Sequence, residues 1–202
     1  YVQHSNLPDL IALSQGDTLM ETFSYQATDG ITSVTGALNM IIAGRNDAPI
    51  LAADAAILTE DSPTVQGNVL ANDADPDLKD QLLVVALTTQ GQYGTLVLDS
   101  TGHYTYQLNN SLAQGLAQGE TVVDSFSYTA TDSRLTASST LAVTISGLND
   151  APVTIGTIAE QTAVAGQVWR WTLPETSTLF KEVDVGDSVT LNVTQANGAA
   201  LP

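Results

Sequence analysis

The residues best suited to chemistry are carboxylates that crowd into one short loop. Asp73, Asp75, Asp77 and Asp80 lie within a single acidic stretch of the chain. Alternate residues of an extended segment lie about 7 Å apart, where two unit charges repel by about 0.6 kcal/mol in water and about 2.4 kcal/mol at an effective dielectric constant of 20. A bound cation relieves such repulsion, and oxygen donors without His or Cys suit Ca²⁺ better than a structural Zn²⁺. We therefore predict calcium binding here; the alternative is a solvated acidic turn bent by Pro76.

An internal repeat shows which elements position this loop. Residues 1–50 align without a gap on residues 104–153, and 19 of the 50 pairs are identical. Tandem repeats of this kind build extended arrays. We predict three parts: residues 1–47 are the C-terminal half of a repeat module, residues 48–150 are one complete module, and residues 151–202 begin a module of another type. The half-module is too short to bury a core alone, so we read the chain as an excerpt of a longer polypeptide or as one whose ends pair with something else.

The dominant hydrophobic period is two, which is typical of half-buried β-strands. Phe126, Tyr128 and Ala130 alternate with polar residues, and after a turn Leu141 and Ile145 continue the alternation. This pattern predicts a β-hairpin that closes a sandwich. The half-module repeats it at 23–27 and 38–42.

Further strands of the complete module are expected near 55–59, 64–71, 82–89, 94–98 and 103–108. Residues 109–118 are expected to form a helical turn or a loop. About seven strands at this spacing indicate an immunoglobulin-like sandwich, so we predict an all-β chain of tandem modules of this kind.

The pattern changes after Pro152. Period-two alternation predicts strands over 168–173 and 189–194, and places Trp169 and Trp171 on one face. We interpret the two tryptophans as core residues rather than as a platform for sugar stacking.

Strand order predicts that the acidic residues meet at the two poles of the sandwich. The incoming linker with Asp47, the loop with Asp73, Asp75 and Asp77, and the last hairpin turn with Asp132 share one pole. The opposite pole holds the turn after the first strand, the outgoing linker and an acidic loop of the next module. We predict that their metal ligands are Glu60, Asn149, Asp150, Asp184 and Asp187.

Composition excludes several partners. Acidic residues number 22 against five basic ones, for a net charge of −17, which argues against nucleic acid and anionic membranes. No apolar run is long enough to insert into a membrane. With no cysteine, a secreted form would depend on something other than disulfides, and metal ions would serve.

Catalysis is not expected. His4 and His103 are the only histidines, and neither accompanies a serine or aspartate motif. Lys79 and Lys181 lie within acidic loops, where ion pairing is the simplest account of them.

Several motifs in order resemble a known family. Residues 67–77, 93–99, 102–106, 124–132 and 149–152 are similar to the VCBS-type repeat of giant bacterial RTX surface adhesins. Residues 153–202 resemble the opening of a cadherin-like or dystroglycan-type module, although Lys-Glu-Val-Asp follows Phe180 where those relatives commonly have Asp-Pro-Asp or Asp-Val-Asp.

The resemblance implies calcium sites at module junctions, type I secretion and display on the bacterial cell surface. The function expected is therefore a calcium-stabilised part of an adhesin shaft in biofilm or cell adhesion. Its partners would be calcium ions and neighbouring modules, with cell-surface glycan or protein contacted by other domains. The alternative is an immunoglobulin-like spacer or carbohydrate-contacting module of a secreted multidomain enzyme.

Overall fold

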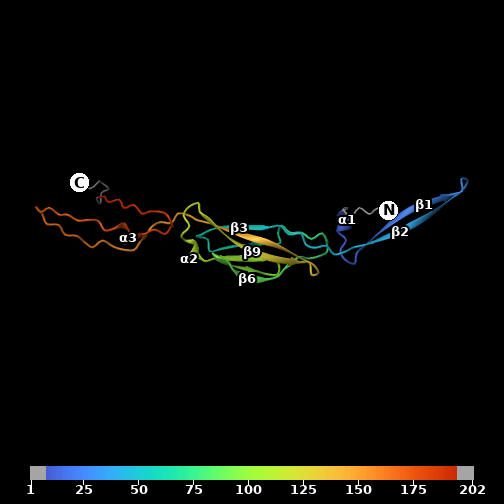
Figure 1. Ribbon diagram of the computed structural model, residues 1–202, viewed down its shortest axis with the longest axis horizontal. Coiled ribbons are helices and arrows are strands. Elements are labelled where there is room, and N and C mark those ends of the chain that lie inside the picture. Colours follow the sequence, from blue (N-terminus) through green and yellow to red (C-terminus); the bar gives the residue numbers. More distant parts are fainter. Residues whose placement is uncertain (1–7, 195–202) are drawn as a thin grey trace.

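The computed structural model describes residues 8–194. These residues form an elongated molecule with a β-sandwich in the middle (Figure 1). A two-stranded ribbon extends from one end of the sandwich, and a largely irregular segment extends from the other.

Two four-stranded sheets make the sandwich. One sheet has the order β3 (Asp54–Thr59), β10 (Thr136–Ser146), β9 (Thr121–Thr131) and β5 (Leu83–Val84). The other has the order β4 (Thr64–Asn68), β8 (His103–Leu108), β7 (Gly94–Leu98) and β6 (Leu87–Gln90). Strand β3 runs parallel to β10, and the other pairs are antiparallel. The predicted all-β, immunoglobulin-like architecture is confirmed.

Alternation along the strands builds the core between the sheets. Strands β9 and β10 turn Phe126, Tyr128, Leu141 and Ile145 inward, as their period of two predicts. From the facing sheet, Tyr106 is fully buried, and its ring centroid lies 5.9 Å from that of Phe126. The core therefore joins the first half of the module, β3–β8, to the closing hairpin β9–β10.

Two predicted strands of the module differ from those observed. The strand expected over 64–71 ends at Asn68, because the Asn68 side chain accepts the N–H of Leu70 at 2.8 Å and turns the chain. The strand expected over 82–89 is divided: β5 pairs with β9 in one sheet, whereas β6 pairs with β7 in the other. The chain thus changes sheets at this corner. The predicted helical turn is present as α2 (Asn110–Ala113).

The N-terminal part consists of the short helix α1 (Pro8–Ile11) and the two-stranded ribbon of β1 (Thr18–Thr28) and β2 (Ser33–Ala43). Its tight turn places Gly30 at φ +92°. The equivalent residue of the complete module, Ser133, has φ 84°, so the same left-handed turn recurs in both copies.

The C-terminal segment contains less regular structure than predicted. Only β11 (Val153–Thr154), α3 (Thr176–Leu179) and β12 (Phe180–Lys181) form there among the described residues, and the strands predicted over 168–173 and 189–194 are absent as named elements. Alternation indicates which face of a strand would be buried, but a strand also needs a hydrogen-bonded neighbour.

The prediction that both tryptophans lie in a core is wrong for the described chain. Trp169 and Trp171 are 48% and 37% exposed, and their rings stack on each other with centroids 6.3 Å apart. Both side chains are therefore partly open to solvent and pack on each other.

Candidate metal centres

Three carboxylates meet where the chain leaves the sandwich. Glu60 follows β3, Asp150 lies in the linker after β10, and Asp184 follows β12. One oxygen atom from each of these side chains lies within 4.8 Å of the other two. We call Glu60, Asp150 and Asp184 the outgoing cluster.

Backbone contacts hold the outgoing cluster together. Oε1 of Glu60 accepts the N–H of Leu148 at 2.6 Å, and Oδ2 of Asp184 accepts the N–H of Asp150 at 3.0 Å. The N–H of Val185 donates to the carbonyl of Gly115 at 3.0 Å, which attaches the loop after β12 to the end of the sandwich. The cluster is thus assembled from both sides of the linker.

The remaining oxygens of this cluster have no hydrogen-bond partner among the described residues. They are Oε2 of Glu60, Oδ2 of Asp150 and Oδ1 of Asp184. Glu60 is fully buried and Asp184 is 3% exposed, so water does not solvate them freely. A buried, unpaired carboxylate oxygen is costly unless a proton or a cation neutralises it.

The electrostatics agree with this view. Burial raises the pKa of Glu60, and the charges of Asp150 and Asp184 raise it further. Burial also raises the pKa of Asp150, as do the charges of Asp61, Asp184 and Glu182. Protons, like cations, would relieve the same repulsion.

A second group of acids lies where the chain enters the sandwich. It comprises the amide of Asn46 and four carboxylates, and we call it the incoming cluster: Asn46, Asp47, Asp75, Asp77 and Asp132.

The incoming cluster repeats the linker geometry of the outgoing one. The N–H of Asp47 donates to Oδ2 of Asp77 at 2.7 Å, as that of Asp150 does to Asp184. Asn46 donates through Nδ2 to Oδ2 of Asp132 at 2.7 Å. In both linkers, therefore, the backbone N–H of an aspartate donates to a buried carboxylate from the part of the chain that follows the linker.

Unpaired oxygens occur here too. Oδ1 of Asn46, Oδ2 of Asp75 and Oδ1 of Asp77 are buried without a hydrogen-bond partner among residues 8–194. Burial raises the pKa of Asp75, and the charges of Asp132, Asp77 and Asp80 add to this. Burial opposes ionisation of Asp132 as well, but the N–H groups of Leu135 and Arg134 and the Asn46 amide outweigh it and lower its pKa.

An ion pair and an amide contact cross the same junction. Nζ of Lys79 lies 2.5 Å from Oδ1 of Asp17 in the ribbon. Nη1 of Arg134 donates to Oε1 of Gln15 at 3.2 Å. The ribbon is therefore attached to the sandwich by side chains as well as by the linker. Lys79 is thus ion-paired as expected, but with Asp17 of the ribbon rather than with an acid of its own loop.

Two predicted ligands, Asp47 and Asp132, lie in the incoming cluster but contribute no unpaired buried oxygen, and three more lie apart from the unpaired oxygens of both clusters. Asp73 turns toward its own module, where Oδ1 accepts the N–H of Ala52 at 2.8 Å and Oδ2 accepts the hydroxyl of Tyr128 at 3.2 Å. Asn149 is exposed and donates to the carbonyl of Asp150. Asp187 is exposed, and its backbone N–H donates to the backbone carbonyl of Asp184. Its carboxylate is not one of the three that meet in the outgoing cluster. Residue spacing indicates the loop in which a side chain lies but not the direction in which it points.

Other residues join the clusters although they were not predicted as ligands. Asn46 is buried in the incoming cluster, while Asp61 and Glu182 act on Asp150 through their charges. The signal for Asn46 was present, because Asn-Asp occurs at the same place in both linkers.

The donor sets fit calcium. Every unpaired atom of either cluster is a carboxylate or amide oxygen, and histidine and cysteine contribute none. Ca²⁺ prefers such hard oxygen donors and tolerates irregular geometry. In the outgoing cluster Glu60, Asp150 and Asp184 would hold it; in the incoming cluster Asn46, Asp75 and Asp77 would do so.

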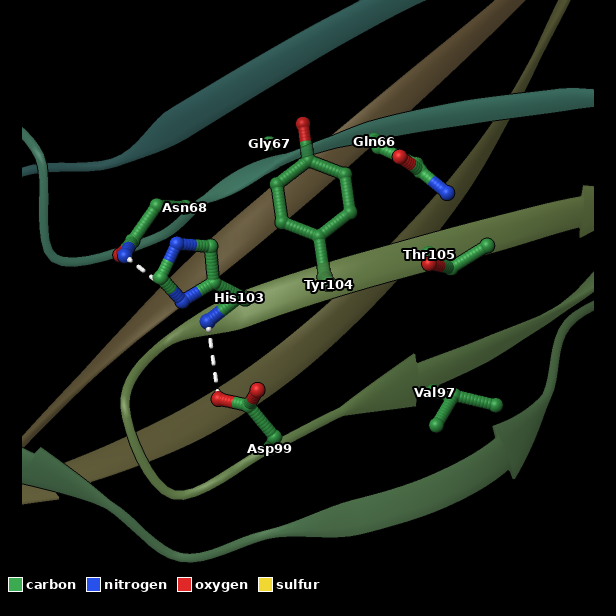
Figure 2. A pocket seen from close by; sticks show the side chains of 8 residues that line it. All are labelled: Gln66, Gly67, Asn68, Val97, Asp99, His103, Tyr104 and Thr105. Atoms are coloured by element: carbon green, nitrogen blue, oxygen red, sulfur yellow. Dashed lines mark hydrogen bonds between the residues drawn. The ribbon is translucent and has the colours of Figure 1, made fainter.

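A shallow surface depression lies away from both clusters, over β4, β7 and β8. Figure 2 shows His103 and Asp99 at its edge and the ring of Tyr104 beside Gly67. The N–H of His103 donates to Oδ1 of Asp99 at 3.1 Å, and its ring contacts Thr101 and Asn68. These contacts shape the turn between β7 and β8.

The fold is a β-sandwich with acidic residues gathered at both of its linkers. A family model described as a bacterial cadherin-like domain matches residues 46–147, just over half of the chain. The chain therefore belongs to the bacterial cadherin-like domain family. None of the curated proteins matches it. Among residues 8–194, no helix is long and apolar enough to cross a membrane.

Two kinds of solved structure are similar to the chain. The mouse clustered PcdhgC3 EC1-3 structure is 15% identical with a TM-score of 0.41, and the alignment covers 72% of this chain and 47% of that one. The endo-fucoidan hydrolase MfFcnA4 from glycoside hydrolase family 107 is 13% identical with a TM-score of 0.31, and the alignment covers 65% of this chain and 19% of the hydrolase. The chain thus spans less than half the length of either.

Proposed function

We propose that this chain is part of an extracellular array of cadherin-like modules whose junctions are stabilised by calcium. The observation that carries the proposal is the outgoing cluster: three carboxylates from two sides of one linker, each with a buried oxygen that has no hydrogen-bond partner in the described part of the chain. A bound Ca²⁺ would supply two positive charges where the chain now concentrates only negative ones.

The chain's own residues give such a site its mechanical role. Glu60 is anchored to the sandwich through β3, and Asp184 to the segment beyond the linker through β12. Asp150 lies between them, with its amide bound to Asp184. Neutralising the trio would remove the repulsion that drives the two sides apart. The incoming cluster would act in the same way between the ribbon and the sandwich.

The composition of the two linkers favours a stiff, extended arrangement of the modules. Pro49 and Pro152 follow the two Asn-Asp pairs, fix φ and lack an N–H, so each linker begins partly stiffened. With both junctions closed, the array would hold a distant domain away from a surface. We therefore propose a place in the shaft of a bacterial RTX surface adhesin of the VCBS-repeat kind, exported by type I secretion and acting in adhesion or biofilm. The gapless internal repeat and the family membership support this.

We also propose that the described residues carry no catalytic site. The buried carboxylate of Asp124 has a structural role, because it accepts three backbone N–H groups and the Tyr106 hydroxyl. His103 is hydrogen-bonded within its own turn, to Asp99 and Thr101. Neither arrangement presents a nucleophile beside a base.

Calorimetric titration of the whole chain with Ca²⁺ tests the proposal. Calcium should bind the parent, and Asp184→Asn should weaken binding at the outgoing cluster at least about tenfold, because it removes a charge from that site. Asp187→Asn, an exposed aspartate three positions along the same loop, is the matched control and should bind as the parent does. Absence of any heat or spectroscopic change on adding Ca²⁺ would refute calcium binding.

A further inference from the structure

The ribbon β1–β2 and the hairpin β9–β10 are the same structural unit in two environments. Thr18 pairs with Ala43 in the ribbon, and Thr121 pairs with Ser146 in the hairpin. All eleven residue pairs of the two units correspond under the 103-residue shift of the repeat. Pairing register is therefore conserved along with sequence.

Burial separates the two copies. Tyr25 and Leu38 are 60% and 53% exposed, whereas their counterparts Tyr128 and Leu141 are 3% and 1% exposed. Tyr128 and Leu141 belong to the core of the complete module, and Tyr25 and Leu38 occupy the corresponding positions of the ribbon. The ribbon thus presents a core face to solvent, and a large exposed apolar face marks an interaction surface.

The complete module shows what covers this face. Strand β3 pairs in parallel with β10 over Leu141–Ser146, and the sheet of β4, β8, β7 and β6 packs across the core. The hydroxyl of Tyr128 lies 2.8 Å from Oδ2 of Asp54, at the start of β3. Among the described residues no strand pairs with β2 on the edge that corresponds to the β3 side of β10.

We propose that the ribbon is the acceptor half of a split sandwich, and that its partner is a half-module with the residue pattern of 50–109. The first strand of the partner would add in parallel to β2 over residues 38–43, by β-augmentation. Its other strands would cover Leu38 and Tyr25. An aspartate at the place of Asp54 would accept the Tyr25 hydroxyl.

The same partner would complete the incoming cluster. In the outgoing cluster Glu60 accepts the N–H of Leu148, whose counterpart in the first linker is Arg45. A partner with a glutamate at the place of Glu60 would bring that carboxylate to the N–H of Arg45, beside Asp47 and Asp77. This part rests on the proposed calcium function, and it makes partner binding and calcium binding mutually reinforcing.

The test uses the whole chain and, as probe, a separate polypeptide with the sequence of residues 48–109. In chelator, sedimentation should show a 1:1 complex, and hydrogen exchange should slow at the amides of 38–43. Leu38→Asp in the chain should weaken the complex at least about tenfold, because it places a charge in the covered face. Ile41→Asp is the matched control, since Ile41 points to the opposite face of the same strand and is already 69% exposed.

A double-mutant cycle checks the predicted polar contact. Tyr25→Phe in the chain and Asp54→Ala in the probe should each weaken the complex several-fold, and together no more than either does alone. Fully additive losses would contradict this pairing.

Three results would overturn the docking surface. They are the absence of a complex at about 0.1 mM probe, equal losses for Leu38→Asp and Ile41→Asp, and self-association of the chain that Leu38→Asp abolishes, which would assign the face to a second copy.

Calcium separates this inference from the proposed function. Ca²⁺ should tighten the complex with the parent probe and should not do so with a Glu60→Gln probe. A complex that forms in chelator and ignores Ca²⁺ would support the docking surface and overturn the shared metal site. A chain that binds Ca²⁺ but not the probe would retain the proposed function and refute the docking surface.

Discussion

Oε1 of Glu60 accepts the backbone N–H of Leu148 at 2.6 Å. This bond ties the turn after β3 to the linker that leaves the sandwich, and it holds a fully buried carboxylate beside Asp150 and Asp184. An amide oxygen could accept the same N–H without carrying charge. The pair thus allows the structural and electrostatic roles of Glu60 to be separated.

Glu60→Gln should abolish most of the stability that calcium adds through the outgoing cluster. For the parent at a free Ca²⁺ concentration of 100 times Kd, one native-state site adds about 2.7 kcal/mol to the free energy of unfolding. In chelator the variant should be as stable as the parent or more stable by about 1 kcal/mol, because one of three repelling charges is gone. Denaturant unfolding with and without Ca²⁺ measures both.

The exposed Glu160 provides the control for that experiment. Glu160→Gln should leave both free energies unchanged. Identical unfolding curves for the parent in Ca²⁺ and in chelator would contradict the calcium hypothesis.

In chelator, mild acidification should act on Glu60 with a definite sign. Its pKa is higher in the folded state than in the unfolded chain, chiefly because of burial, so the folded state binds the proton more tightly. The resulting stabilisation is complete below the unfolded pKa and is lost as pH rises through the folded pKa. As pH falls from neutral toward the pKa of an unfolded glutamate, the parent should therefore gain stability relative to Glu60→Gln. If the melting temperatures of the two proteins changed equally over that range, the pKa of Glu60 would not be raised in the folded state.

Asp124→Ala should be one of the most destabilising substitutions in the complete module. Asp124 is 3% exposed and accepts the N–H groups of Gln92, Tyr93 and Gly94 and the hydroxyl of Tyr106. Removing it leaves buried donors unsatisfied, at a cost of about 2–4 kcal/mol in the free energy of unfolding.

The control for Asp124 is Asp99, another aspartate that accepts backbone N–H groups in a turn but is exposed. Asp99→Ala should cost much less, since water can replace the carboxylate. Equal losses from the two substitutions would mean that burial of Asp124 is not what makes it important.

Calcium should also set the flexibility of the outgoing junction. In chelator the acids on either side of the linker repel, so small-angle scattering should give a broader distribution of end-to-end dimensions than in Ca²⁺. Asp150→Asn should keep the sandwich folded but show less stiffening by Ca²⁺, because it removes a charge at the pole and nothing from the core. An unchanged distribution on chelation of the parent would mean that the linker is rigid without metal.

The sequence by itself determined the sandwich and the neighbourhoods of its acids. Period-two alternation in residues 121–146 identified the core face of β9 and β10, because side chains of a strand alternate strictly between two faces. The 103-residue repeat predicted that the ribbon would copy this hairpin. Recurrence of Asn-Asp in both linkers indicated where acidic residues of adjacent parts would meet.

Only the tertiary structure decided which acids meet. Asp73 and Asp77 lie four positions apart in one loop, yet Asp73 binds its own module through Ala52 while Asp77 binds the linker at Asp47. The direction of a side chain in an irregular loop depends on hydrogen bonds to distant residues, which local spacing does not encode. Local pattern was insufficient around Trp169 as well. Alternation there did not make a strand, because a strand also needs hydrogen-bonded neighbours to complete a sheet.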